Sequence, residues 1–302
     1  MTQDRWSEWL LQKRFGGDQQ AAEAGMRMLL GVRDAVLKRA DLHAGDTLLD
    51  VGAGDGLIAF GGLDRVGPAG RVIFADISQP LLEHAQRLAQ DMGVSERCSF
   101  VNAHAEDLNP LDDASVDAVT TRSVLIYVKD KSAAFREFHR VLKPGGRLSL
   151  WEPINRFTEL FAPGQYWGPG VEGLEALAER LQPFYGALQP LDSDPMLDFD
   201  ERDLLRQCEE AGFRYVRVTL SMYTAPARPA SWAGWLNTSG NPNIPSRADA
   251  MRQLFTDDER ALFESLVRPR IETGGQIERS AVAHLVAVKD GGARPPDLMR
   301  GA

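Results

Sequence analysis

A glycine-rich loop follows the first strongly apolar run of the chain. The run over residues 47–51 leads directly into Gly52, Gly54 and Gly56, after which the pattern becomes helical. Glycines at this spacing let the backbone turn tightly beneath a ligand that faces the N-terminus of a helix. The loop therefore predicts a nucleotide-type site, with a plain strand-to-helix turn as the alternative. It is not the dinucleotide fingerprint, because Leu57 stands where the third glycine is needed.

Carboxylates surround this loop. Asp50 precedes it, Asp55 lies within it, and Asp76 ends the next apolar run, where an acid that binds ribose hydroxyls is expected. Three carboxylates disfavour a pyrophosphate and favour a ligand with ribose hydroxyls and cationic groups. S-adenosylmethionine carries an ammonium and a sulfonium and no phosphate, so we expect it to be the cofactor. A nicotinamide dinucleotide is the alternative.

The elements that position the loop alternate along the chain. Short apolar runs with β-branched residues predict strands, and stretches such as 79–93 and 130–146 have the apolar spacing of helices. The predicted strands cover 47–52, 71–76, 98–103, 116–121, 146–152, 214–220 and 280–290. Strands and helices in this alternation predict right-handed βαβ units. We expect an α/β fold with a doubly wound, mostly parallel seven-stranded sheet, a Rossmann-like architecture with helical caps.

Five of the six tryptophans lie outside this alternation, and the sixth ends its last strand. Aromatic additions around a rigid sheet are a common way to build a small-molecule pocket. We therefore predict an N-terminal helical cap over 1–45, a cofactor-binding core over 46–152, a cap insertion over 153–200, further core over 201–220 and 280–290, a substrate cap over 221–279, and a disordered tail over 291–302.

Composition excludes several classes of protein. Of 302 residues, 43% are hydrophobic and 25% charged, values of a globular chain, and no apolar run is long enough to span a membrane. The net charge of −9 opposes binding to nucleic acid. Cys98 and Cys208 lie far apart and the five histidines form no close pair, so we expect no disulfide framework and no metal site. The N-terminal residues do not resemble a signal peptide, which predicts a cytoplasmic protein.

Several motifs, taken in order, resemble those of one enzyme family. They are LLDVGAGDG, VIFADIS, AHAEDL, TTRSVLIYV and FREFHRVLKPGGRLSLWEP. This series is similar to the class I S-adenosylmethionine-dependent methyltransferases, in the branch of the ubiquinone and menaquinone C-methyltransferases. The resemblance covers about residues 30–155. It implies that the family's last strand runs antiparallel.

The resemblance also implies cofactor contacts. Asp76 would bind the ribose hydroxyls and Ile77 would pack on the adenine, while His104 stands where the family usually has an Asp that accepts from the adenine amino group. The remaining implied cofactor residues are Asp50, Gly52, Ala53 and Gly54 around the methionine part, Ala105 beside the adenine, and Arg122 and Ser123 at the floor of the methyl-transfer site.

The acceptor is a small molecule in this interpretation, and the sequence offers no obvious strong base to deprotonate it. We expect in-line methyl transfer to a small aromatic or apolar metabolite, driven by alignment and exclusion of water. Glu152 would orient or partly deprotonate the acceptor, with Tyr127 beside it. The predicted acceptor contacts, each with core packing as its alternative, are Trp9, Tyr166, Trp167, Tyr223, Trp232, Trp235 and Asn237. A nucleotide-dependent oxidoreductase and a non-catalytic cofactor-binding protein are the competing functions.

Overall fold

The computed structural model describes residues 4–15, 18–161, 172–274 and 276–291. The chain divides into two compact units, each described below by itself. The sheet unit comprises Leu29–Pro153, Phe199–Ser221 and Val282–Ala302, and the helical unit comprises Met1–Met28, Ile154–Asp198 and Met222–Ala281. The segment 1–45, expected to form one cap, is divided between the two units after Met28.

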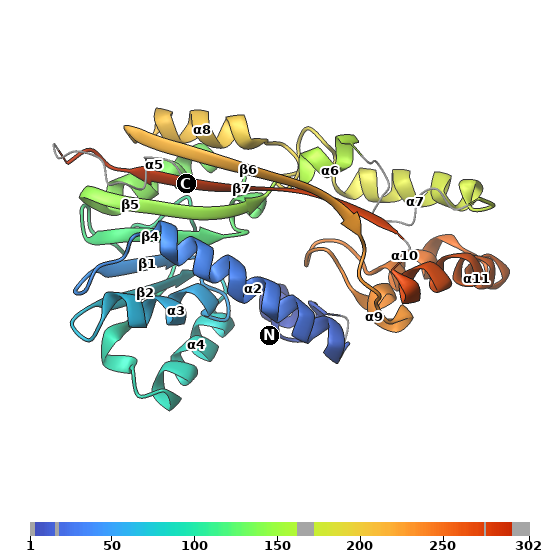
Figure 1. Cartoon of the computed structure of the whole chain (residues 1–302), viewed down its shortest axis with the longest axis horizontal. Helices are drawn as coiled ribbons and strands as arrows, with labels where there is room; N and C mark the ends of the chain where they lie inside the picture. The colour runs from blue at the N-terminus through green and yellow to red at the C-terminus, as the bar shows by residue number, and fades with distance from the viewer. Residues whose placement is uncertain (1–3, 16–17, 162–171, 275, 292–302) are drawn as a thin grey trace. The chain divides into compact units, whose positions relative to one another are not determined.

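The predicted α/β fold with a seven-stranded, mostly parallel sheet is confirmed (Figure 1). The strands are β1 (Thr47–Val51), β2 (Arg71–Asp76), β3 (Cys98–Asn102), β4 (Val116–Arg122), β5 (Leu142–Pro153), β6 (Tyr215–Pro226) and β7 (Ile277–Val288). Their order in the sheet is β3-β2-β1-β4-β5-β7-β6. Strands β1 to β5 pair in parallel, and β7 pairs antiparallel with β5.

Helices and short helical turns connect the strands. They are α1 (Arg5–Glu8), η1 (Trp9–Lys13), α2 (Gln19–Arg39), α3 (Leu57–Val66), α4 (Gln79–Asp91), η2 (Ser95–Arg97), η3 (Leu125–Tyr127), α5 (Lys131–Val141), α6 (Asn155–Phe161), α7 (Glu175–Leu188), α8 (Glu201–Glu210), α9 (Trp232–Asn237), α10 (Arg247–Leu254) and α11 (Asp257–Thr273). In the sheet unit, α3 and α4 lie on one face of the sheet and α5 and α8 on the other (Figure 1).

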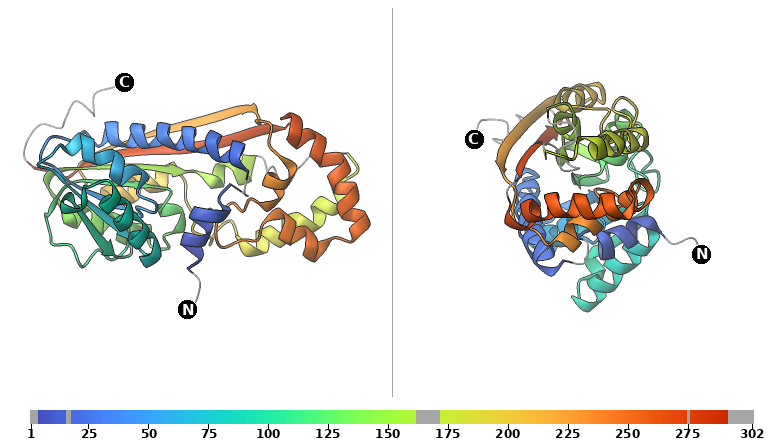
Figure 2. Two further views of the ribbon diagram at one scale, coloured as in Figure 1. Left: turned by 90° about the horizontal axis from the view of Figure 1, so that it is seen from below. Right: turned by 90° about the vertical axis from the view of Figure 1, so that its right-hand side faces the viewer.

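The central strand β1 shows why these elements form a doubly wound sheet. Its residues from Leu48 to Val51 are all buried, which explains the continuous apolar run in place of an alternating pattern. Residues 29–39 of α2 pack with α3 and α4 on one side of this strand, and the left view of Figure 2 shows this blue helix lying along the strands. Burial of both faces leaves the carboxyl ends of the parallel strands as the edge at which a ligand binds.

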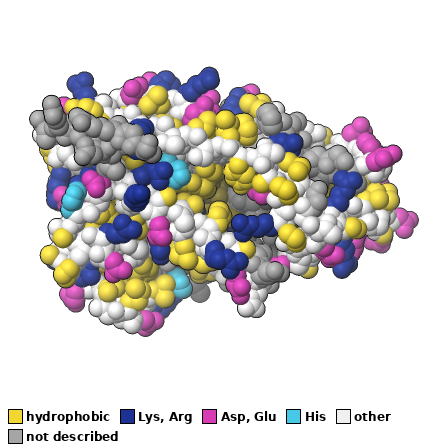
Figure 3. Space-filling model, viewed as in Figure 1, with side chains coloured by type: hydrophobic (Ala, Val, Ile, Leu, Met, Phe, Trp, Pro, Cys, Tyr) yellow, Lys and Arg dark blue, Asp and Glu magenta, His cyan; other side chains and the backbone are white. Residues whose placement is uncertain are grey.

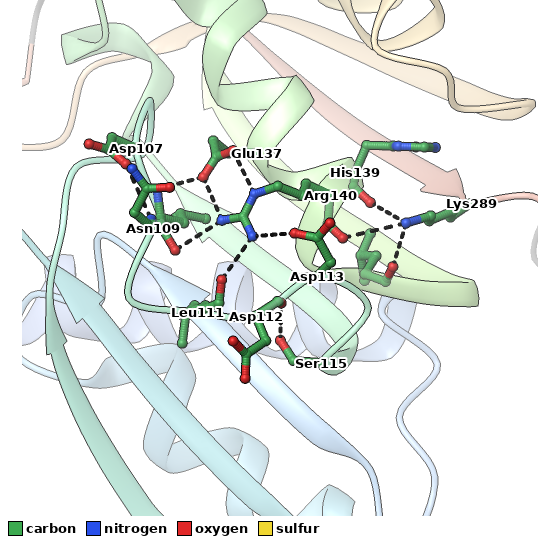
Figure 4. Close-up of polar contacts among 12 residues, drawn as sticks. Asp107, Asn109, Leu111, Asp112, Asp113, Ser115, Glu137, His139, Arg140 and Lys289 are labelled. Atoms are coloured by element: carbon green, nitrogen blue, oxygen red, sulfur yellow. Dashed lines mark hydrogen bonds and ion pairs between the residues drawn. The ribbon is translucent and has the colours of Figure 1, made fainter.

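Arg140 fixes the connection between β3 and β4 (Figure 4). Its guanidinium donates two hydrogen bonds to the carboxylate of Glu137, both at 2.8 Å, and one to Asp113. It also donates to the backbone oxygens of Leu108 and Leu111. The hydrogen bond from Arg140 is the main reason that the pKa of Glu137 is lowered. This network ties the loop before β4 to helix α5.

The side chain of Lys289 binds the C-terminal end of α5. Lys289 donates from Nζ to the backbone oxygens of His139 and Leu142, each at 2.7 Å, as Figure 4 shows for His139. A positive charge at the C-terminus of a helix is favourable, because the last carbonyl groups carry partial negative charge. The imidazole of His139 packs edge-on against Phe213, with ring centroids 5.1 Å apart. His139 therefore has a structural role.

The helical unit has a separate hydrophobic core. Buried residues of α7, α9, α10 and α11 pack together in it. Its aromatic centre is the stacked pair Trp232 and Trp235, whose ring centroids lie 5.2 Å apart, with Phe263 beside both rings. Arg247 lies over the ring of Trp235 at 4.4 Å. Most of the chain's C-terminal tryptophans thus serve packing inside this unit.

Three further observations concern membrane-spanning helices, metal-binding groups and surface charge. Among the described helices, none is long and apolar enough to cross a bilayer. Within the described part of the chain, no group of three His, Cys, Asp or Glu side chains is placed to hold a metal ion. Acidic and basic side chains are interspersed over the face shown in Figure 3, and that face carries no continuous basic surface.

Candidate active site

The glycine loop turns sharply between β1 and α3. Gly52, Gly54 and Gly56 have φ values of +67°, +57° and +84°, the region that disfavours residues with a side chain. A Cβ at Gly52 would lie 2.2 Å from Cγ2 of Val124, so the loop also depends on close packing with the segment after β4. The backbone N–H groups of Gly52 and Ala53 donate to the oxygen of Ala75 at the end of β2. The loop is thereby held against the edge of the sheet.

Asp50 is directed into the protein. Its side chain is 2% exposed, and it accepts a hydrogen bond from the Thr120 hydroxyl at 2.8 Å and another from the Ala59 backbone N–H at 3.1 Å. These contacts join β1 to β4 and to the first turn of α3. The resemblance implied that Asp50 surrounds the methionine part of the cofactor, and its geometry favours an indirect role in which it fixes the glycine loop.

Asp76 connects the loop to the next helix. One carboxylate oxygen accepts from the backbone N–H of Gly54 and the other from that of Ser78, both at 2.8 Å. The Ser78 hydroxyl in turn caps α4 by accepting from the Leu81 N–H. The side-chain amide of Asn102 donates to the backbone oxygen of Asp76 at 3.0 Å. The end of β2 is therefore fixed from three sides.

The predicted adenine residues lie next to Asp76 along the sheet edge. Ile77 is 43% exposed, which is unusual for an isoleucine that directly follows a buried strand. His104 is exposed and forms an isolated bridge with Asp107, while Ala105 is buried. An exposed apolar side chain beside a buried carboxylate is the arrangement expected of a surface that a purine covers.

Glu152 anchors the turn that follows β4. Its side chain has no exposed surface, and Oε1 accepts from the backbone N–H groups of Val124 at 2.9 Å and Leu125 at 3.1 Å, with Ile126 adding a further bond. Oε2 is buried and makes no hydrogen bond to a residue that the structure describes. Ser123 precedes these residues with a φ of +54°. The carboxyl therefore supports the first turn of η3, which ends at the half-buried Tyr127.

At this edge of the sheet, three acidic side chains face one basic side chain. Burial raises the pKa of Asp50 to about 7, with the Asp76 carboxylate adding to the increase. Burial also raises the pKa of Glu152 to about 7. The positive charge of Arg122, at the end of β4, opposes both shifts. Because β2, β1, β4 and β5 are neighbours in this order, the four charged groups gather at one edge of the sheet.

Comparison with known proteins places the chain in a family. Residues 49–150 match the family described as "Methyltransferase domain". The chain is 38% identical over 116 residues to the ubiquinone/menaquinone biosynthesis C-methyltransferase UbiE of Hahella chejuensis, which covers 38% of this chain and 46% of that protein. It is 31% identical over 183 residues to the UbiE of Escherichia fergusonii, which covers 58% of this chain and 69% of that protein. The chain belongs to the UbiE-like branch of the class I S-adenosylmethionine-dependent methyltransferases.

The fold of this methyltransferase is also that of a solved protein. YcgJ of Bacillus subtilis superposes with a TM-score of 0.55 at 21% identity, covering 87% of this chain and 99% of that chain. The likeness concerns the fold alone. The chain spans less than half the length of the Hahella relative, so the acceptor is not given by these relatives. They lend no support to an oxidoreductase or to a non-catalytic binding protein.

Two predicted acceptor residues of the methyltransferase line one cavity of the helical unit. Trp9 and Asn237 both border a cavity of about 520 Å³. The indole Nε1 of Trp9 donates to the backbone oxygen of Ser239 at 3.2 Å, which fixes the ring in the cavity wall. Most of the other lining residues are charged or polar, among them Arg5, Glu8, Lys13 and Asp249, and Pro242, Ile244 and Pro245 add an apolar part.

The other predicted acceptor residues are not brought to this cavity. Trp232 is only 8% exposed and belongs to the core of the helical unit with Trp235. Tyr223 is exposed on β6, where its hydroxyl donates to Glu278. Tyr166 and Trp167 lie outside the described residues. The acceptor contacts of all these residues stay predictions.

Some residues that build the site carry no recognisable signal in the sequence. Thr120 binds Asp50 across 70 positions of the chain, and Asn102 binds the turn after β2 from the neighbouring strand. Val124 fills the space above Gly52. Ser78 is the exception, because a serine directly before a helical pattern predicts an N-cap. The rest depend on which strands become neighbours.

Proposed function

We propose that this methyltransferase transfers the methyl group of S-adenosylmethionine to a small, partly aromatic or apolar acceptor by in-line displacement. The observation that carries the proposal is the acidic edge formed by Asp50, Asp76 and Glu152 beside the glycine loop and the exposed Ile77. When bound, S-adenosylmethionine supplies a methyl group on a cationic sulfur. An acidic, partly dry edge attracts such a cation and repels a pyrophosphate.

The residues present fit this cofactor. The Asp76 carboxylate is held at the carboxyl end of β2 by the backbone N–H groups of Gly54 and Ser78, beside the glycine loop, which is where the ribose hydroxyls of this cofactor would lie. Ile77 offers an apolar surface for the adenine, with Ala105 and His104 as its proposed neighbours. Asp50, Gly52, Ala53 and Gly54 shape the backbone around the methionine part, and Arg122 and Ser123 form the floor of the transfer site.

We assign Glu152 a positioning role in this reaction. Its carboxyl holds three consecutive backbone N–H groups and is closed off from solvent. Such a group fixes the turn from Ser123 to Tyr127, and the turn in turn fixes the side chains that border the transfer site. The direct proton-transfer role expected from the sequence needs contact with the acceptor, and burial of both carboxyl oxygens argues against it. Tyr127 is then the nearer candidate for contact with the acceptor.

The two units have different proposed roles. The sheet unit carries every proposed cofactor residue, from Asp50 to Ser123. The helical unit carries the cavity bordered by Trp9 and Asn237, and the indole of Trp9 is the part of its lining that supports an aromatic acceptor. The methyl transfer itself needs alignment of the acceptor lone pair with the methyl group and exclusion of water, and no strong base.

Two measurements test the proposal. Calorimetry with the full chain should detect binding of S-adenosylhomocysteine and none of NADH. Incubation with S-adenosylmethionine labelled in its methyl group, together with a panel of small aromatic and apolar metabolites, should transfer the label to at least one compound. Binding of NADH without binding of S-adenosylhomocysteine would overturn the proposed function.

A further inference from the structure

Three basic side chains gather in the sheet unit away from the glycine loop. They are Arg39 in the last turn of α2, Arg217 in β6 and His284 in β7. No acidic residue forms an ion pair with Arg39 or Arg217 among the described side chains, although the chain as a whole has a net charge of −9. A cluster of basic side chains without an acidic partner is unexpected in a protein with a net negative charge.

Helix α2 fixes the position of Arg39. The Ser149 hydroxyl donates to the backbone oxygen of Val36 at 2.9 Å, and Nε of Arg147 donates to that of Ala40 at 3.1 Å. Both donors lie on β5 and, being two residues apart, point to the same face of the sheet. The last turn of α2 therefore lies against this face.

His284 points to the same face. In the antiparallel ladder between β5 and β7, Trp151 is opposite His284 and Ser149 is opposite Val286. Residues directly opposite each other in such a ladder project to the same side of the sheet. Trp151 packs against the cluster that contains Val36, which confirms that this is the side covered by α2.

Arg217 shares this face. β6 lies next to β7 in the sheet, and the Tyr223 hydroxyl donates to the Glu278 carboxylate at 3.3 Å from one strand to the other. Side chains alternate between faces with a period of two. Arg217 is six positions from Tyr223, and His284 is six positions from Glu278, so Arg217 and His284 project to one side.

Arg39 donates to the backbone oxygen of Ala35 at 3.3 Å, one turn earlier in its own helix, whereas Arg217 and His284 leave buried nitrogens without a partner among the described residues. Burial and the charge of Arg217 lower the pKa of Arg39, and burial and the charge of Arg39 lower the pKa of His284 to about 4. Nε of Arg217 and both ring nitrogens of His284 are buried and make no hydrogen bond within the described part of the chain. Buried polar atoms of this kind are rare in folded proteins, and each requires a partner.

We propose that Arg39, Arg217 and His284 bind a phosphate group. A phosphate would accept hydrogen bonds from Nε of Arg217 and from the one ring nitrogen of the neutral His284 that carries a hydrogen, and its charge would offset the repulsion between the two guanidinium groups. Arg39 comes from the helix that covers this face, and Arg217 and His284 come from the sheet, so the donors approach from two sides. A tetrahedral oxyanion with several acceptor oxygens meets such donors better than a planar carboxylate does. The group belongs either to free phosphate or to a phosphomonoester.

Calorimetric titration of the full chain, at constant ionic strength, tests this site. The probes are inorganic phosphate, phenyl phosphate and acetate. Inorganic phosphate or phenyl phosphate should bind and acetate should not. The tighter of the two phosphates identifies the source, a free ion or a phosphomonoester. Addition of the bound phosphate should also shift the ring resonances of His284 in NMR spectra.

Two matched variants complete the test. Arg217→Gln should weaken phosphate binding by about tenfold or more, the loss of one charged hydrogen-bond donor. Arg214→Gln removes the same charge from an exposed position three residues earlier and should leave the affinity unchanged. In chloride alone, Arg217→Gln should unfold at the same or a higher temperature, because it relieves repulsion.

The proposal is overturned if neither phosphate binds, if acetate binds equally well, or if both variants weaken binding to the same extent. Binding of S-adenosylhomocysteine, measured on the same samples, shows whether each variant is folded. It also keeps failure of the phosphate site separate from failure of the proposed methyl transfer.

Discussion

Replacement of the buried Glu152 by glutamine changes stability in a way that depends on pH. The ordinary pKa of this carboxyl is 4.5 and its pKa in the folded protein is about 7. The folded state therefore holds its proton more tightly than the unfolded state. The contribution of Glu152 to stability is most favourable below pH 4.5 and declines as the pH rises to about 7. The full difference corresponds to about 3 kcal/mol.

The variant Glu152→Gln does not titrate. Its amide oxygen can accept from the N–H groups of Val124 and Leu125, and its NH₂ group would take the place of Oε2, which has no described partner. When Glu152 of the wild type is protonated, its O–H group at Oε2 is a donor that likewise has no described partner. The two proteins should consequently have nearly equal stability at about pH 5, and the variant should gain about 2 kcal/mol on the wild type between about pH 5.5 and pH 8.

Urea unfolding of the cofactor-free wild type and variant at about pH 5.5 and at about pH 8 measures this difference in stability. The control is Glu106→Gln, which changes a carboxylate that accepts one N–H, from Asp130, at a less buried position. A stability difference between wild type and Glu152→Gln that is the same at both pH values would refute the reasoning. Once an acceptor is known, a fall in kcat below tenfold supports positioning, whereas a loss of about a hundredfold indicates proton transfer.

Three other predictions concern the cofactor site and the fold. Asp76→Ala should weaken binding of S-adenosylhomocysteine by about ten- to a hundredfold in calorimetry, the value of hydrogen bonds to a charged group, and unchanged affinity would remove Asp76 from the site. Binding of the cationic cofactor should lower the pKa of Asp50 and Glu152, so affinity should increase as the pH rises through about 7, with proton release visible as a dependence of the binding enthalpy on the buffer. Arg97→Met should lower the free energy of unfolding by about 2 kcal/mol, because the guanidinium donates to three backbone oxygens around the end of α3. Replacement of the exposed Arg71 by methionine is the control, and an equal loss of stability in both variants would contradict this role of Arg97.

The sequence by itself determined the fold and the place of the cofactor loop. Buried parallel strands appear as short apolar runs bounded by glycine or acidic residues, so β1, β2, β3 and β4 are found within one or two residues of their predicted ends. The positive φ of Gly52 is likewise a local requirement that only glycine meets readily. Such features are read from the pattern because each depends on residues close together in the chain.

The tertiary structure alone decided which distant side chains meet. Asp50 binds Thr120 and Glu152 binds the turn after β4 because β1, β4 and β5 are neighbours with a particular register. Trp232 packs in a core although its position in the sequence suggested an acceptor contact. Arg217 gains its basic neighbours through the order of β7 and β6. Strand order and register are set by packing of the whole sheet, and no local pattern encodes them.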